Sequence, residues 1–118
     1  MWGWDNNVNK VVKIYLNGYV EYFTVAGMPS NPDFNVGDVD LNGVLYLTTS
    51  LTTTIYRVDV DPASPTYLQM LPSLSTTSIS IGDWAFNPID NQIYTITSVS
   101  SGTGGQLIRY NPSTGPLS

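Results

Sequence analysis

The sequence predicts an all-β fold, a propeller-like repeat of four-stranded antiparallel sheets. Runs rich in Val, Ile, Tyr and Thr, which suit a half-buried pleated surface, are interrupted by Gly, Pro and Asn at intervals of about eight to twelve residues. Apolar residues rarely recur at the spacing of an amphipathic helix. One set of strand and turn motifs also recurs with a period in the forties, which is typical of propeller blades.

The first predicted strands lie at residues 10–16 and 19–25. Asn17-Gly18 separates them. Asn-Gly between two such runs is the strongest short-range signal for a hairpin, because a type I′ turn needs positive φ at both central residues. Neither face of the second strand is purely polar, since Glu21 shares its face with Tyr19 and Phe23. We therefore expect both faces of this first unit to be covered.

The middle unit is predicted to contain four strands, at residues 36–41, 44–48, 54–60 and 66–71. Asn42-Gly43 again marks a hairpin turn between the first two strands. Pro62 and Pro65 end the third strand, because proline cannot donate a hydrogen bond to a ladder. The final unit repeats the series with strands at residues 79–86, 92–97 and 106–110, and residues 87–91 form its first turn.

The repeat is carried by a Gly-Asp pair, a Tyr on the following strand and one basic residue in each unit. These residues are Gly37, Asp38, Tyr46 and Arg57 in the middle unit, Gly82, Asp83, Tyr94 and Arg109 in the final unit, and Lys13 in the first. A carboxylate at the same place in each unit is expected to hold adjacent blades together through backbone amides. The recurring basic residues are expected to pair with nearby acids.

The 118 residues are predicted to form a single propeller-like domain or fragment, about two and a half blades long. A partial blade at residues 1–33 is followed by a blade at 34–75 and a partial blade at 76–118. Known propellers have about four to eight blades. The chain is therefore cut from a larger propeller, closed by self-association, or an open stack of sheets. We expect apolar surface at both ends unless a partner covers it.

Four segments carry a family resemblance. They are residues 37–46 (GDVDLNGVLY), 83–94 (DWAFNPIDNQIY), 55–59 (IYRVD) and 107–112 (LIRYNP). Together they resemble an uncharacterised bacterial repeat domain of large secreted surface or spore-coat proteins. The resemblance covers about residues 8 to 115. It implies a propeller-like fold, a location outside the cell or on the cell or spore surface, and no known catalysis. It supplies no functional residues.

The composition excludes several classes of function. The chain has no Cys and no His, which rules out a disulfide framework, a Cys/His zinc site and a Ser-His-Asp triad. Four Lys and Arg against nine Asp and Glu give a net charge of −5, which argues against nucleic acid and anionic membranes as partners. No apolar run approaches the roughly 20 residues of a transmembrane helix. No secretion signal and no cofactor are predicted.

Asp38, Asp40 and Asn42, followed by Gly43, resemble the opening of a calcium-binding loop. Calcium takes six to eight oxygen ligands, and alternate carboxylates on a tight turn supply several of them. The later acidic ligand of such a loop is absent, since Tyr46 and Thr49 stand at the positions where an acid is required. The sequence therefore favours an Asn-Gly hairpin with acidic flanks, and no metal ligand is assigned.

Trp84, Asp83, Asp38 and Asp40 are the candidate ligand-binding residues. An exposed Trp84 would stack on a sugar ring, but it lies in the first strand of its unit, where blade-to-blade packing is the more usual role. Trp2 and Trp4 lie near a terminus, and they are expected either to be exposed or to pack onto a partner.

The sequence favours a non-catalytic structural or interaction module of a bacterial surface, with no catalytic residue. Its partners would be a second copy of the chain or the remainder of a larger propeller. One alternative is a lectin-like propeller that binds a glycan. A second alternative is a hydrolase or lactonase in which Asp38 and Asp83 hold a divalent ion, because carboxylates are the remaining route to catalysis in this composition.

Overall fold

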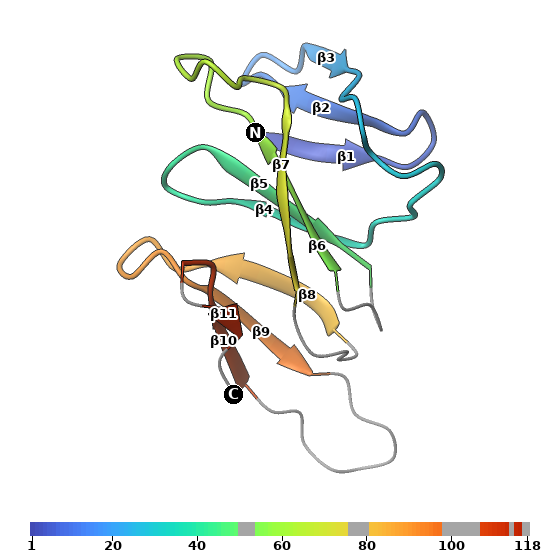
Figure 1. Ribbon diagram of the computed structural model, residues 1–118. Coiled ribbons are helices and arrows are strands. Elements are labelled where there is room, and N and C mark those ends of the chain that lie inside the picture. Colours follow the sequence, from blue (N-terminus) through green and yellow to red (C-terminus); the bar gives the residue numbers. More distant parts are fainter. Residues whose placement is uncertain (50–53, 76–80, 98–106, 114, 117–118) are drawn as a thin grey trace.

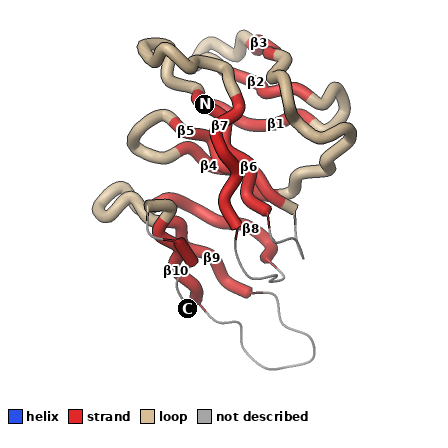
Figure 2. Tube along the Cα trace, viewed as in Figure 1, coloured by secondary structure: helices blue, strands red, loops and turns tan. Residues whose placement is uncertain are grey.

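The computed structural model describes residues 1–49, 54–75, 81–97, 107–113 and 115–116. These residues form eleven strands in three antiparallel sheets and contain no helix (Figure 2). Each sheet is a meander formed from one continuous stretch of chain, and the sheets lie in layers, one above another (Figure 1). The predicted all-β class of small antiparallel sheets is confirmed.

Sheet 1 has the order β1-β2-β3. Its strands are β1 (Trp2–Asp5), β2 (Lys10–Ile14) and β3 (Val20–Phe23). Sheet 2 has the order β4-β5-β6-β7. Its strands are β4 (Val36–Val39), β5 (Val44–Thr48), β6 (Thr54–Asp59) and β7 (Met70–Ser75). Sheet 3 has the order β8-β9-β10-β11. Its strands are β8 (Ile81–Phe86), β9 (Ile93–Thr97), β10 (Leu107–Asn111) and β11 (Gly115–Pro116).

Both Asn-Gly hairpins are present, but with a different turn from the one predicted. Gly18 and Gly43 have positive φ, whereas Asn17 and Asn42 do not. In the first hairpin the Tyr15 N–H bonds the Tyr19 carbonyl across a three-residue loop. In the second hairpin Asp40 and Val44 are joined in the same way. These are three-residue loops that place glycine in the left-handed region, and they are not type I′ turns.

Three strands differ from the sequence prediction. β1 and β11 were not predicted, and the strand predicted at residues 66–71 is β7, which begins at Met70. Residues 66–68 form a turn because the Ser64 and Thr66 hydroxyls bond the Asp59 carboxylate and Leu68 takes a φ of 62°. Of the strands predicted at 79–86 and 106–110, residues 79, 80 and 106 lie outside the described residues.

Two separate cores fill the spaces between the sheets. The first lies between sheets 1 and 2, where Val11 packs with Leu45, Leu47 and Val58, and each of these is at most 1% exposed. Trp2 and Trp4, which were expected to be exposed or to pack onto a partner, are half-buried and pack against this core of their own chain. The second core, between sheets 2 and 3, contains Val36, Tyr46, Ile55, Trp84, Ile93 and Tyr110. Sheet 2 is therefore covered on both faces.

Sheets 2 and 3 stack in the same orientation. The turn after β4 lies beside the turn after β8, where the Leu41 N–H donates to the Asn91 side-chain oxygen at 2.9 Å. Farther along the same strands, the Phe86 N–H donates to the Asp38 carboxylate at 2.9 Å. The first strands of these two sheets therefore run side by side in the same direction, as they do in adjacent propeller blades.

Sheet 1 stacks in the same orientation as sheets 2 and 3, but it has no equivalent of β4 and β8. Trp2 of β1 pairs with Lys13, as Tyr46 of β5 pairs with Arg57 and Tyr94 of β9 pairs with Arg109. Asn6, in the turn that ends β1, exchanges two hydrogen bonds with the backbone of Phe34, which precedes the start of β4. The end of β1 therefore lies at the beginning of β4, and the two strands run in opposite directions. β1 therefore corresponds to β5, which also runs opposite to β4. Three sheets stacked in one orientation do not by themselves form a closed ring of blades, so a propeller-like arrangement is not confirmed. No sheet is closed among the described residues.

Candidate functional site

Asp38 joins two sheets, as the repeat predicted. It lies on β4, and one of its carboxylate oxygens accepts the Val39 N–H at 2.8 Å. Its other oxygen accepts the Phe86 N–H of β8 at 2.9 Å. The carboxylate thus supplies an acceptor to a backbone amide of the neighbouring sheet. This is a packing contact, and it accounts for the position of Asp38 in the repeat.

Asp83 makes the same local bond, because its carboxylate accepts the Trp84 N–H at 2.8 Å. Asp83 is exposed, and it has no hydrogen bond to another sheet among the described residues. The neighbouring Trp84 is 8% exposed and lies in the core between sheets 2 and 3. Its indole N–H is buried and has no hydrogen-bond partner among the residues that the structure describes. Its position is therefore a packing position, and its ring is not available to stack on a sugar.

The Asp38–Asn42 segment is held by hydrogen bonds within the protein. Asp40 is 8% exposed, and one of its oxygens accepts the N–H groups of Asn42 and Val44, both at 2.9 Å. The other oxygen accepts the Tyr46 hydroxyl at 3.3 Å. These bonds form the hairpin with acidic flanks that the sequence favoured. Within the described part of the chain, no three His, Cys, Asp or Glu side chains are grouped to hold a metal ion.

A cavity of about 260 Å³, here called the junction pocket, opens where sheets 2 and 3 meet. Its lining from sheet 2 is Asp40, Asn42, Val44, Tyr46 and Arg57, and its lining from sheet 3 and the chain after β10 is Asn91, Pro112 and Ser113. Of the four predicted ligand-binding residues, Asp40 alone lines this pocket. Asp38, Asp83 and Trp84 are not brought into it.

Asp40, Tyr46 and Arg57 lie together in the lining of the junction pocket, and Tyr46 is hydrogen-bonded to Asp40. Burial, together with the nearby Asp40 charge, raises the pKa of Tyr46 to about 12, although Arg57 acts in the opposite direction. The Tyr46 hydroxyl therefore remains protonated at neutral pH and donates to Asp40. The repeat identified Tyr46 and Arg57, but not their shared site. Asn91 and Ser113 lie too far away in the sequence for any motif to have found them.

Sheet 3 carries a matching group on its outer side. The Tyr94 hydroxyl donates to the Asp90 carboxylate at 2.6 Å. This bond is the main cause that lowers the pKa of Asp90, and Arg109 contributes in the same direction. Arg57 instead donates from its Nε to the Pro72 carbonyl at 2.8 Å, and the expected pairing of the two arginines with acids stays a prediction. Lys13 differs, since its ammonium group lies over the rings of Trp2 and Tyr15.

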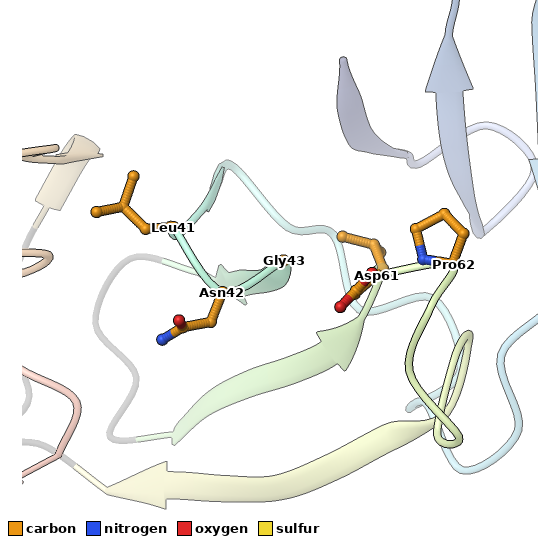
Figure 3. A pocket seen from close by; sticks show the side chains of 6 residues that line it. Leu41, Asn42, Gly43, Asp61 and Pro62 are labelled. Carbon is orange, nitrogen blue, oxygen red and sulfur yellow. The ribbon is translucent and has the colours of Figure 1, made fainter.

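A second depression, of about 500 Å³, lies at the tip of the β4–β5 hairpin (Figure 3). It is open to solvent, and its lining is Leu41, Asn42, Gly43, Val60, Asp61 and Pro62. Asp61 is its single charged residue, and its carboxylate already accepts the Ala63 N–H at 2.9 Å. The junction pocket, with two charged side chains and contributions from two sheets, is therefore the more developed candidate site.

The comparisons with known proteins concern the whole chain. A family model described as "Repeat of unknown function (DUF6923)" matches residues 1–118. None of the curated proteins compared with the chain matches it. Among the described residues, no helix is long and apolar enough to cross a membrane.

Proposed function

We propose that this chain, which belongs to the DUF6923 family of repeats, is a non-catalytic interaction module whose outer sheets bind further β-sheet surface. The partner is a second copy of the chain or the remainder of a longer chain. The contact between sheets 2 and 3 is an example of such binding within the molecule. The two sheets pack through apolar side chains, and the carboxylate of Asp38 accepts a hydrogen bond from the neighbouring sheet. The proposed mechanism is side-by-side stacking of sheets.

The exposed face of sheet 3 carries this proposal. Ile96 and Leu107 are neighbours across β9 and β10, and they are 61% and 69% exposed. Soluble proteins seldom leave paired aliphatic side chains of a sheet face in water unless a partner covers them. The inner sheet shows the contrast, since Leu45 and Leu47 are buried almost completely.

Sheet 1 also has an uncovered face, although the sequence predicted that both of its faces would be covered. Ile14 and Val20 are cross-strand neighbours, and each is 38% exposed. Tyr22 is also exposed, and its hydroxyl bonds Asp5. Apolar surface thus lies at both ends of the stack, as expected. Two different surfaces on one molecule favour head-to-tail association, which forms rings or open chains of molecules.

A location on a bacterial cell or spore surface is part of the proposal. Its support is the resemblance of residues 37–46 and 83–94 to repeats of secreted surface proteins. A module that stacks with further sheets suits such assemblies, because each added sheet covers the apolar face of the one before it.

The test is the molar mass in solution, measured by light scattering over a wide range of protein concentration. We expect the mass to rise above that of one chain as the concentration increases, because buried apolar area stabilises association. A well-folded monomer that persists at the highest concentration would overturn the proposal for self-association. Circular dichroism on the same samples checks that the chain is folded.

A further inference from the structure

The junction pocket has the size and composition of a small polar ligand site. Drug-sized ligands occupy pockets of about 300–1,000 Å³, and the junction pocket, at about 260 Å³, lies just below that range. Asp40 is almost completely buried beside it, and both adjoining sheets contribute polar side chains. The pocket is thus matched to a molecule smaller than most drugs.

The charges in the pocket indicate a neutral ligand. Asp40 and Arg57 are the charged residues in its lining, and their charges cancel. An anion brought beside Asp40 and a cation brought beside Arg57 would each meet repulsion at short range. Tyr46 adds no charge, because it remains protonated at neutral pH.

The remaining lining groups both donate and accept hydrogen bonds. Asn91 is oriented by its side-chain oxygen, which accepts the Leu41 N–H, so its amide NH₂ group is available as a donor. The exposed Asn42 side chain makes no hydrogen bond to another described residue and offers both an acceptor and a donor. Ser113 adds a hydroxyl from the opposite side of the pocket.

We propose that the junction pocket binds a small neutral polyhydroxylated molecule, of the size of a single sugar residue. Each hydroxyl of such a ligand donates one hydrogen bond and accepts others. Its hydroxyls would donate to Asp40 and accept from Arg57 and Asn91. Because the lining comes from both sheets, the site exists where sheets 2 and 3 are stacked. It lies away from the exposed faces that are proposed to bind further sheets.

The test is NMR titration of the isotopically labelled full chain. The probes are the methyl glycosides of glucose, galactose and mannose, N-acetylglucosamine and glycerol. We expect at least one probe to bind with about millimolar affinity, as suits so few atoms. The shifted signals should include those of Asn42, Asn91 and Ser113. If no probe shifts these signals at high concentration, or if the shifts fall elsewhere, the proposal is wrong.

Matched variants sharpen the test. Asn42→Ala and Ser113→Ala should each weaken binding of the best probe by about tenfold, because each removes a hydrogen bond to the ligand. Asn7→Ala, in the exposed turn after β1, is the control and should bind normally. Glucuronate and glucosamine, which carry opposite charges, should bind more weakly than the neutral sugars. Equal affinity in all the variants, or a preference for either charged sugar, would overturn the proposal.

Discussion

At the scale of single residues, Asp38 and Asp83 form a natural comparison. Both carboxylates accept the N–H of the following residue, but only Asp38 also accepts an N–H from another sheet among the described residues. We expect Asp38→Ala to lower the free energy of unfolding by about 1–3 kcal/mol more than Asp83→Ala, because it leaves the Phe86 N–H without its acceptor. Urea unfolding of both variants measures the difference. Equal destabilisation would contradict the role of Asp38 between the sheets.

Asp59 provides a prediction about pH. Its burial raises the pKa, but hydrogen bonds from Ser64, Thr66 and the Asp61 N–H outweigh this effect, so the pKa lies below its usual value. A carboxyl whose pKa is lower in the folded state stabilises the fold above its unfolded pKa. That stability is lost as the pH falls through the folded pKa. The free energy of unfolding of the wild type should therefore fall in acid. In Asp59→Asn it should fall less over the same pH range, which urea unfolding at a series of pH values measures. The same dependence on pH in both proteins would contradict the role of Asp59.

Some residues of the junction pocket could be identified from the sequence, and others could not. Asp40 was identified because acidic residues around an Asn-Gly turn form a visible motif. Tyr46 and Arg57 were visible as repeated residues, but their common contact with one cavity was not. Asn91 and Ser113 reach the cavity because sheet 3 stacks on sheet 2. Contacts of this kind depend on tertiary packing, and no local pattern records them.

At the scale of elements, the two hairpins differ in the surroundings of their glycines. Gly18 and Gly43 have φ values of 87° and 78°, so a side chain at either position is strained. A Cβ at Gly18 would meet nothing within 4 Å, whereas a Cβ at Gly43 would lie 2.8 Å from the Asp61 Cβ. The β4–β5 hairpin is therefore packed closely against the chain after β6.

We expect Gly18→Ala to cost about 1–2 kcal/mol through backbone strain alone. Gly43→Ala should cost clearly more, because the backbone of Asp61 must also move. Thermal unfolding of the two variants measures both costs. If the two variants were equally stable, the close approach at Gly43 would be wrong.

The hairpins also show what an element-level pattern can predict. Asn-Gly correctly located both reversals of the chain, because glycine tolerates positive φ. It did not determine the turn type, since the loop length depends on which residues pair across the strands. The prediction of a strand at residues 66–71 failed for a similar reason. Side-chain bonds to Asp59 hold the chain in turns there, although its residues have good strand propensity.

At the scale of the whole molecule, the exposed face of sheet 3 leads to a test of association by mutation. Ile96→Lys and Leu107→Lys should reduce the association expected at high concentration, because each places a charge on the apolar face. Ile89→Lys is the matched control, since Ile89 is exposed in the turn after β8 and lies off this face. If the control reduced association as much as the other two variants, the face would be wrongly assigned.

The sequence by itself determined the all-β class, the segments that form most of the strands, and the recurrence of Asp, Tyr and Arg in successive units. These follow from local properties, namely strand propensity, turn chemistry and a fixed period. The tertiary structure decided how the sheets stack. Sheets 1 and 3 cover opposite faces of sheet 2, and all three sheets stack in the same orientation, with hydrogen bonds at Asn6 and Asn91 between neighbouring sheets. Hydrophobic packing is non-directional, so apolar faces specify that sheets cover one another but not in which orientation. The junction pocket exists only because of that choice.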